Sequence, residues 1–252
     1  MPEGERGSLT ARGLRKAFGD LLVLGGVDLA ARPGEVLSVL GPSGCGKSTL
    51  LRLLAGFERP TSGEVLQDGE PVRGPSPLRG MVAQAGGLFP WLTLRDNLAV
   101  GPRAQGRSRA ETTELVDGLL ARTGLEEFAQ SLPRSLSGGM RQRGSIAQVL
   151  ACRPPVLLLD EPFAALDAQT RLRMHEWLGS LLRASPTTTV LVTHDVEEAL
   201  LLGDRLALLS ARPSTVVEEL AVPFGPDRGR AVLSDPAFVA LKSEVLDRVL
   251  RA

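Results

Sequence analysis

The sequence contains no tyrosine, only two cysteines and only three lysines, and its formal net charge is zero. Its 29 basic side chains are balanced by 29 acidic ones. This balance argues against a nucleic-acid binder, because such proteins carry an excess of Lys and Arg facing phosphates. Cys45 and Cys152 lie far apart and match no metal-binding or redox spacing. We therefore expect no disulfide framework, as is usual in a reducing cytosol.

Long apolar runs are also missing. The run Val156–Leu159 (VLLL) is far shorter than the ~20 residues that a membrane-spanning helix needs. The first ten residues, MPEGERGSLT, hold no apolar core of the kind found in secretion signals. Of the 252 residues, 43% are apolar and 23% charged, the composition of an ordinary globular domain large enough for one α/β fold. We expect a protein that does not cross a membrane by itself.

Hydrophobic periodicity and turn residues predict both strands and helices. Short strands are expected between Leu9 and Leu40, separated by turns at 18–20, 25–26 and 33–34. Further strands are predicted over 61–69, 79–84, 156–159 and 189–192, and helices over 48–57, 93–100, 109–123 and 140–152. A last helix opens at Asp235-Pro236 and has one apolar face formed by Phe238, Leu241, Val245 and Val249. The pattern indicates two halves of one α/β sheet on either side of a helical insertion.

The segment 41–49 (GPSGCGKST) contains the pattern G-x-x-x-x-G-K-[ST] between a predicted strand and a predicted helix. Its glycines let backbone N–H groups approach phosphate oxygens, and the helix N-terminus adds partial positive charge. Lys47 would place its ammonium between β- and γ-phosphates, and Ser48 would bind Mg²⁺. A glycine-rich turn that matches by chance is the alternative, but it does not explain the strand–helix setting or a lysine in so arginine-rich a chain. The predicted nucleotide-binding residues are Gly41, Pro42, Ser43, Gly44, Cys45, Gly46, Lys47, Ser48 and Thr49.

Two later strands end in polar side chains. Asp160 and Glu161 follow VLLL, and His194 follows the strand that ends TVLVT. Ligands bind beyond the carboxyl ends of parallel strands, so these side chains would reach the nucleotide. We assign Asp160 to Mg²⁺, Glu161 to the attacking water and His194 to the γ-phosphate. Taken alone, Asp160 and Glu161 are equally well interpreted as solvated side chains at the end of a strand. The other histidine, His175, has charged neighbours and is expected to take no part in chemistry.

Gln84 ends another candidate edge strand, Arg79–Gln84 (RGMVAQ). A Gln at that place can contact both Mg²⁺ and the attacking water while the loop that follows it moves. Standing alone, it would be read as a polar residue that enters a loop. Together with the P-loop and the two acidic residues, it is assigned to the metal and to catalysis.

The segment Leu136–Gln142 reads LSGGMRQ and resembles the signature motif of ABC ATPases, which almost no other P-loop class carries. The motifs follow the family's order along nearly the whole chain: P-loop 41–49, Q-loop Gln84, signature 136–142, Walker B Asp160-Glu161, D-loop Ala165-Leu166-Asp167 and switch histidine His194. The resemblance implies the ABC ATPase architecture, which is α/β. It has a P-loop NTPase (RecA-like) core, an N-terminal antiparallel β subdomain and an inserted α-helical subdomain. Gly144 and Ser145 are unusually small for a helix interior, and no motif accounts for them.

The resemblance also implies a working pair of subunits. Ser137, Gly138 and Gly139 precede a predicted helix and offer a second anion-binding helix N-terminus. In the family this end closes on the ATP held by a partner's P-loop, so two ATP molecules are sandwiched between two copies, with Asp167 of the D-loop at the nucleotide. Phe18 stands where the family stacks an aromatic residue, often Tyr, on adenine. An ordinary Ser-Gly-Gly helix cap is the alternative reading of the signature residues.

A narrower resemblance concerns importers of nitrate, sulfonates and taurine. It rests on 88–97 (LFPWLTLRDN) and on the tail from Arg212-Pro213 to 235–238 (DPAF). It implies an ATPase at the cytoplasmic face of the membrane that powers import of small anionic solutes through a separate transmembrane permease, served by an extracytoplasmic solute-binding protein. The apolar residues Phe89, Pro90 and Trp91 predict a surface for a permease helix, with a satellite hydrophobic core as the alternative.

These motifs divide the chain into four expected parts: residues 1–84 as the β subdomain and P-loop half, 85–150 as the helical signature subdomain, 151–210 as the Walker B and switch half, and 211–252 as a tail with a final helix.

Two other classes of protein compete with a transporter ATPase as interpretations of this sequence. Soluble ABC-type ATPases of DNA repair need a long coiled-coil insertion, but Gln84 and Ser137 are only 53 positions apart (137 − 84). Translation-type members usually carry two sets of motifs, and this chain has one. A P-loop kinase leaves the signature and His194 unexplained.

Overall fold

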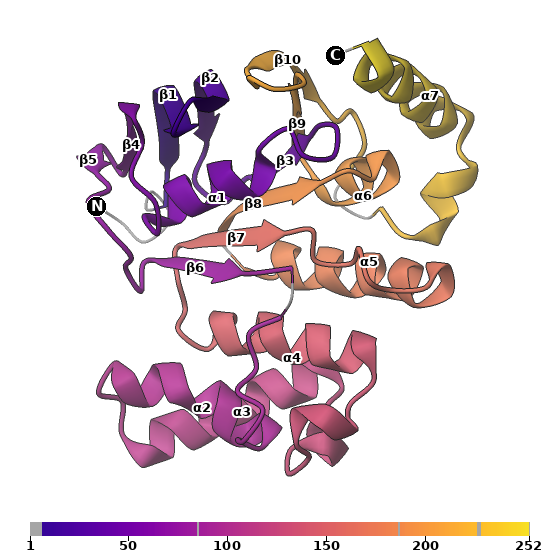
Figure 1. Ribbon diagram of the computed structural model, residues 1–252. Helices are drawn as coiled ribbons and strands as arrows, with labels where there is room; N and C mark the ends of the chain where they lie inside the picture. The colour runs from indigo at the N-terminus through magenta and orange to yellow at the C-terminus, as the bar shows by residue number, and fades with distance from the viewer. Residues whose placement is uncertain (1–6, 85, 186, 226–227, 252) are drawn as a thin grey trace.

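The computed structural model describes residues 7–84, 86–185, 187–225 and 228–251, which form two sheets surrounded by helices (Figure 1). The strands are β1 (Leu9–Phe18), β2 (Leu21–Ala31), β3 (Val36–Leu40), β4 (Ser62–Gln67), β5 (Glu70–Pro71), β6 (Arg79–Val82), β7 (Val156–Asp160), β8 (Thr188–Thr193), β9 (Arg205–Leu209) and β10 (Val216–Ala221). The helices are α1 (Lys47–Ala55), α2 (Leu94–Ala104), α3 (Arg109–Thr123), α4 (Gly138–Leu150), α5 (Ala168–Arg183), α6 (Val196–Leu202) and α7 (Pro236–Arg251). No helix in these described ranges combines the length and apolar character needed to span a bilayer.

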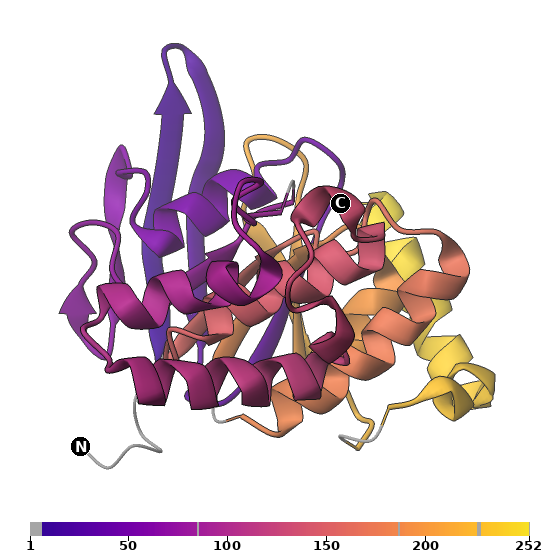
Figure 2. The same ribbon diagram turned by 90° about the horizontal axis from the view of Figure 1, so that it is seen from below.

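The smaller sheet is antiparallel, with strand order β2-β1-β4-β5. Its β1–β2 hairpin extends beyond the other elements (Figure 2). The predicted turn at Gly25-Gly26 is wrong, because both glycines lie inside β2, which runs unbroken for 11 residues. The Gly25 N–H donates to the carbonyl of Ser214 (2.8 Å), and a Cβ on Gly25 would lie 3.3 Å from the Pro213 carbonyl oxygen. Glycine here permits a close approach of two backbones and does not form a turn.

The larger sheet has the order β10-β9-β3-β8-β7-β6 and is parallel except for β10. Strands β3, β7 and β8 are buried along their whole length, as expected for strands covered on both faces. In the register, Leu40 is paired with Thr193, and Asp160 with Val192. The carboxyl ends of β3, β7 and β8 therefore lie side by side at one edge of the sheet. Strand β6 is the outermost strand next to β7, as its sequence predicts.

Helices α2, α3 and α4 form the insertion between β6 and β7 and pack on one another around their own apolar cluster (Figure 1). This packing explains the small residues after the signature. A Cβ on Gly144 would lie 2.8 Å from Cδ1 of Leu94 and 3.2 Å from Cδ1 of Leu88, so glycine lets α4 pack closely on α2 without displacing these side chains. The Ser145 hydroxyl accepts a hydrogen bond from the Gly87 N–H (3.3 Å).

Helix α7 packs beside α6 at the end of the chain (Figure 1). Phe238 and Val245 are buried, and Leu241 and Val249 pack partly buried against the same cluster. The predicted apolar face of the last helix is confirmed.

Candidate nucleotide site

The loop between β3 and α1 is shaped for an anion. Gly46 is the N-cap of α1 with φ 116°, in the left-handed region, and no side chain caps the helix. A Cβ on Gly46 would lie 2.7 Å from Cγ1 of Val23, so both the backbone angle and the available space call for glycine. Because no side chain caps the first turn, its N–H groups are available to phosphate oxygens, which suit the positive end of the helix. The residues present fit a nucleotide phosphate.

Lys47 is buried beneath this loop. Its Nζ donates to the carbonyls of Gly41 (2.8 Å) and Pro42 (3.1 Å) and lies 3.7 Å from Oε1 of Glu161. A buried ammonium needs several oxygen partners to offset its lost hydration. The structure thus places the lysine predicted for phosphate binding next to the predicted catalytic acid.

Two of the predicted Mg²⁺ ligands lie in direct contact. The Ser48 hydroxyl donates to Oδ1 of Asp160 (2.9 Å). Burial raises the pKa of Asp160, while the hydrogen bond from Ser48 lowers it. Hydroxyl and carboxylate oxygens suit Mg²⁺, which usually completes its octahedron with phosphate oxygens and water. In the described ranges no three His, Cys, Asp or Glu side chains group together as a metal site. An ion between Ser48 and Asp160 would therefore need those other oxygens.

Glu161 is the point at which the predicted catalytic residues meet. Its Oε2 lies 3.1 Å from Nδ1 of His194 and accepts a long hydrogen bond from Nε2 of Gln84 (3.5 Å). Its backbone has φ 44° and is tied to β8 by an N–H bond to the carbonyl of Val192 (2.9 Å). A non-glycine residue in the left-handed region costs about 1–3 kcal/mol, and such strain concentrates at functional sites.

The signature and D-loop residues lie together, away from the P-loop. Ser137 caps α4 by accepting from the Met140 N–H (3.3 Å). Asp167 caps α5 by accepting from the Thr170 N–H (3.0 Å), a bond that lowers the pKa of this carboxyl. A Cβ on Gly139 would lie 3.0 Å from Cγ2 of Thr170, so the two caps are neighbours. Within the described residues, no hydrogen bond or ion pair joins 137–139 to 41–49.

Phe18 lies at the tip of the β1–β2 hairpin with 48% of its surface exposed. The Lys16 ammonium is 4.7 Å from the centre of its ring, a cation–π distance. In the described part of the chain no ring contact joins Phe18 to the P-loop. Its role in stacking adenine stays a prediction.

Comparison with known proteins decides the family. The ABC transporter family matches residues 24–164. The chain belongs to this family. It is 47% identical to the taurine import ATP-binding protein TauB of Chromobacterium violaceum, over 88% of this chain and 87% of that protein. It is 43% identical to the nitrate import ATP-binding protein NrtD of Synechocystis sp., over 90% of this chain and 88% of that protein.

Solved ABC structures share the fold. The post-hydrolysis dimer of the ATP-binding cassette MJ0796, bound to ADP and Pi, aligns with TM-score 0.75 and 31% identity, covering 86% of this chain and all of that one. The expected P-loop α/β architecture of an ABC ATPase is confirmed, and this ABC chain binds and hydrolyses ATP.

Two residues near the ABC P-loop, Ser214 and Arg212, were not predicted as site residues from the sequence. The buried Ser214 hydroxyl donates to the carbonyl of Cys45 (2.6 Å), and the Ser214 N–H donates to that of Val23 (3.0 Å). The Arg212 guanidinium lies 3.2 Å from the place of a Cβ on Gly44. The sequence singled out Arg212 only as part of a resembling tail. The segment between β9 and β10 therefore supports the phosphate loop from behind.

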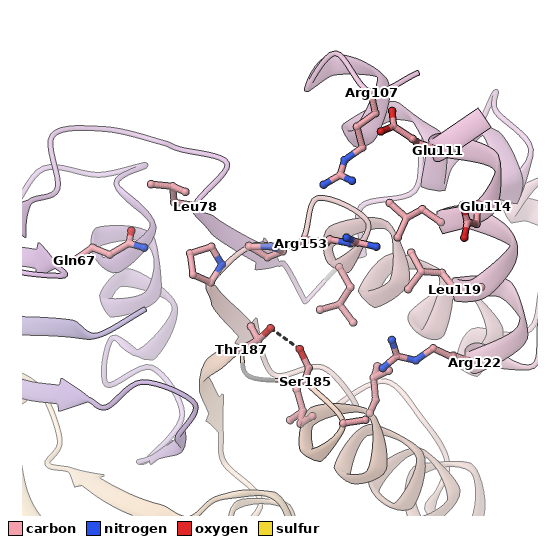
Figure 3. A pocket seen from close by; sticks show the side chains of 18 of the residues that line it. Gln67, Leu78, Arg107, Glu111, Glu114, Leu119, Arg122, Arg153, Ser185 and Thr187 are labelled. Atoms are coloured by element: carbon pink, nitrogen blue, oxygen red, sulfur yellow. Dashed lines mark hydrogen bonds between the residues drawn. The ribbon is translucent and has the colours of Figure 1, made fainter. Parts of the chain in front are cut away.

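A separate cavity of about 1080 Å³ lies near the amino ends of β6, β7 and β8 (Figure 3). Leu78, Pro155 and Thr187, each just before one of these strands, contribute to its wall. The side chains of Arg107, Arg122 and Arg153 surround it, but none of the predicted site residues does. The predicted nucleotide site lies at the opposite, carboxyl end of the strands, where Lys47, Gln84, Glu161 and His194 meet.

Proposed function

We propose that this ABC ATPase powers the import of small anionic solutes through a separate transmembrane permease. The single observation that carries the ATPase part of the proposal is the cluster around Glu161, in which Lys47, Gln84 and His194 all lie within 3.7 Å of its carboxylate. The relatives described above are named for import of taurine and of nitrate, which are small solutes carrying a sulfonate or an oxyanion. This supports a cargo that carries an anionic sulfonate or oxyanion group.

The reaction is ATP + H₂O to ADP + phosphate, with little covalent work for the protein. Lys47 and the N-terminus of α1 hold the phosphates and offset their charge. Ser48, Asp160 and Gln84 would hold Mg²⁺, which would neutralise more of that charge when bound. Glu161 orients the attacking water and accepts its proton, and His194 donates to the γ-phosphate. The contact of His194 with Glu161 keeps these two groups at one point of the site.

A second copy of the chain completes each site. Ser137, Gly138 and Gly139 begin α4, whose N-terminus can bind an anion, yet they make no bond to their own P-loop within the described ranges. We assign these residues, with Asp167, to the ATP on the partner. A dimeric structure of MJ0796, a bacterial ABC transporter cassette, supports a paired arrangement. It is 31% identical to this chain and aligns with TM-score 0.76, and the alignment covers 86% of this chain and all of that one.

Solution mass tests the pairing. The variant Glu161→Gln is expected to be a monomer alone and a dimer with MgATP, because slow hydrolysis keeps the clamp closed; light scattering after size exclusion measures this. Adding Ser137→Arg should abolish the dimer while ATP still binds, since the bulky side chain stands at the partner's phosphate. A Glu161→Gln protein that binds ATP and stays monomeric would contradict a clamp formed by this chain alone.

An apolar groove supports a permease contact. It has a volume of about 360 Å³ and is lined by parts of β6, α2 and α4, including Met81, Val100 and Val149. Phe89 lies at its wall with its ring 5.6 Å from that of Trp91, and 72% of the Trp91 surface is exposed. Such exposure does not fit a satellite core. We propose that a permease helix docks on Phe89, Pro90 and Trp91, because apolar grooves of this kind accept helices.

Replacing Trp91 with Ala is expected to weaken capture of the permease about tenfold or more, since buried aromatic side chains dominate interface energies. ATP binding and the free energy of unfolding should stay close to those of the unchanged chain, because the side chain is at the surface. Co-purification of the two proteins from detergent measures the effect. The variant Phe57→Ala, which removes another exposed ring (59%) outside the groove, is the matched control. Equal capture by both variants would contradict docking at Trp91.

The four parts of the chain would share the work as their motifs suggest. We propose residues 1–84 as β subdomain and P-loop half, 85–150 as helical signature subdomain, 151–210 as Walker B and switch half, and 211–252 as tail. Residues 1–6, 85, 186, 226–227 and 252 of these parts lie outside the described residues. Through the permease, the protein would sit at the cytoplasmic face of the membrane. A solute-binding protein on the other side would deliver the solute.

A further inference from the structure

A buried polar pair lies behind His194. Glu198 on α6 is 3% exposed, and its Oε2 accepts a hydrogen bond from the Thr193 hydroxyl. Its other oxygen, Oε1, lies 3.8 Å from Nε2 of His175 on α5. Within the described chain, this oxygen and both ring nitrogens of the buried His175 make no hydrogen bond. Buried polar atoms without partners are costly, so an arrangement of this kind calls for an explanation.

The pair bridges the two loops that carry the catalytic residues. The His175 ring packs on Phe163, two residues after Glu161, with 5.4 Å between ring centres. Thr193, which donates to Glu198, directly precedes His194, and its hydroxyl accepts from the Asp195 N–H (3.0 Å). One side of the pair thus contacts the connection after β7, and the other side holds the connection after β8.

The acidic groups facing the pair favour the neutral form of Glu198 and the charged form of His175, so burial is what keeps the histidine neutral. Three acidic groups face the pair: Asp195 and Glu197 on the α6 side, and Glu161 after β7. Asp195 forms an ion pair with Arg171 of α5 (3.4 Å), and Glu197 forms one with Lys242 of α7 (2.5 Å).

Burial raises the pKa of Glu198 to about 8 and lowers that of His175. At neutral pH Glu198 is therefore protonated and His175 is an uncharged acceptor. A carboxyl O–H on Oε1 aimed at Nε2 would satisfy these two of the three atoms after a side-chain shift of about 1 Å, with the ring's own proton on Nδ1.

We propose that Glu198 and His175 share one proton and act as positioning residues that hold Thr193–Asp195, and with it His194, against Glu161. The proposal rests on the role assigned to His194 in the proposed function. It makes Glu198 act through Thr193, not on the nucleotide. It also gives His175 a task that the sequence did not suggest, because the reading of His175 as a bystander rested on its charged neighbours.

Imidazole NMR tests the positioning without turnover, because the chain has only two histidines. In the unchanged protein the His175 signal should be that of a neutral imidazole at neutral pH, since burial lowers its pKa. Glu198→Ala removes the acceptor of Thr193 and should move the His194 signal, although residue 198 does not touch it. Glu198→Gln keeps an acceptor for Thr193 and an N–H donor for His175, and should restore the signal.

Hydrolysis by the purified chain gives the second readout. Glu198→Ala is expected to lower kcat about tenfold with KM for ATP unchanged, as for a group acting only in the transition state. Glu198→Gln should keep kcat within about twofold. In the unchanged chain kcat should fall above pH 8, where Glu198 loses its proton, and this alkaline loss should vanish in Glu198→Gln.

Three results would overturn the proposal: an unmoved His194 signal and normal kcat in Glu198→Ala, an equal loss in Glu198→Gln, or an alkaline loss that persists in Glu198→Gln. The first would leave Glu198 with a merely structural role, visible as a lower melting temperature alone.

The variant His194→Ala separates the role of His194 in hydrolysis from the positioning of His194 by Glu198. If it hydrolyses ATP normally, the role of His194 in the proposed function fails, while the NMR shift still tests the positioning by Glu198.

Discussion

Replacing Glu161 with Gln should lower the rate of ATP hydrolysis about 10²–10³-fold, because the amide cannot take the proton of the attacking water. Binding of ATP should be kept or tightened, since the substitution preserves side-chain size and removes a negative charge 3.7 Å from the Lys47 ammonium. Phosphate release in a single turnover, with enzyme in excess over ATP, measures the chemical step. The effect belongs to kcat and not to the affinity for ATP.

Two observations would separate this role from a general loss of charge. Glu114→Gln neutralises an exposed acid outside the site and is expected to leave hydrolysis unchanged. If Glu161→Gln turned over at a near-normal rate, Glu161 would not be the base. Because Glu161 has φ 44°, the melting temperature of each variant should also be compared, so that a backbone change is not mistaken for a chemical one.

Replacing Lys47 with Ala should weaken ATP binding about 100-fold or more. Losing about 3 kcal/mol of charge-assisted bonds to two phosphates corresponds to this factor. The variant also leaves the carbonyls of Gly41 and Pro42 without the ammonium that holds the loop. Titration with ATP by calorimetry measures the dissociation constant, and a melting curve shows whether the fold persists.

The chain offers a matched control for this prediction. Lys242→Ala removes a lysine that pairs with Glu197 on α6, away from the phosphate loop, and should bind ATP normally. Lys47→Arg should bind almost as poorly as Lys47→Ala, because a planar fork does not replace a compact ammonium in a narrow cradle. Tight ATP binding by Lys47→Ala would count against the cradle.

Local signals predicted individual elements well. Helix α3 begins and ends at the predicted residues because both ends carry strong signals: Ser108 and Glu111 form a capping box, and Gly124 ends the helix at φ 63°. The P-loop is likewise set by its own residues, since Gly46 supplies the left-handed angle that begins α1. These features depend on neighbours within a few positions, which a sequence displays directly.

Errors arose where a distant segment decided the outcome. Gly25-Gly26 has the composition of a turn, yet the backbone of Pro213 and Ser214 approaches there and β2 continues through it. The burial of His175 between Phe163 and Glu198 likewise depends on distant segments, while its expected lack of chemistry stays a prediction. The sequence alone does not show which partner lies across the fold.

The sequence by itself determined the chemistry that was available: a phosphate loop with Lys47, carboxylates and a histidine after apolar strands, and a Ser-Gly-Gly helix start. The tertiary structure decided which of these groups meet. Gln84, Glu161 and His194 are separated by dozens of residues and come together because parallel strands β6, β7 and β8 end at one edge. Pairing of distant strands depends on how the whole core packs, and no local periodicity contains that information.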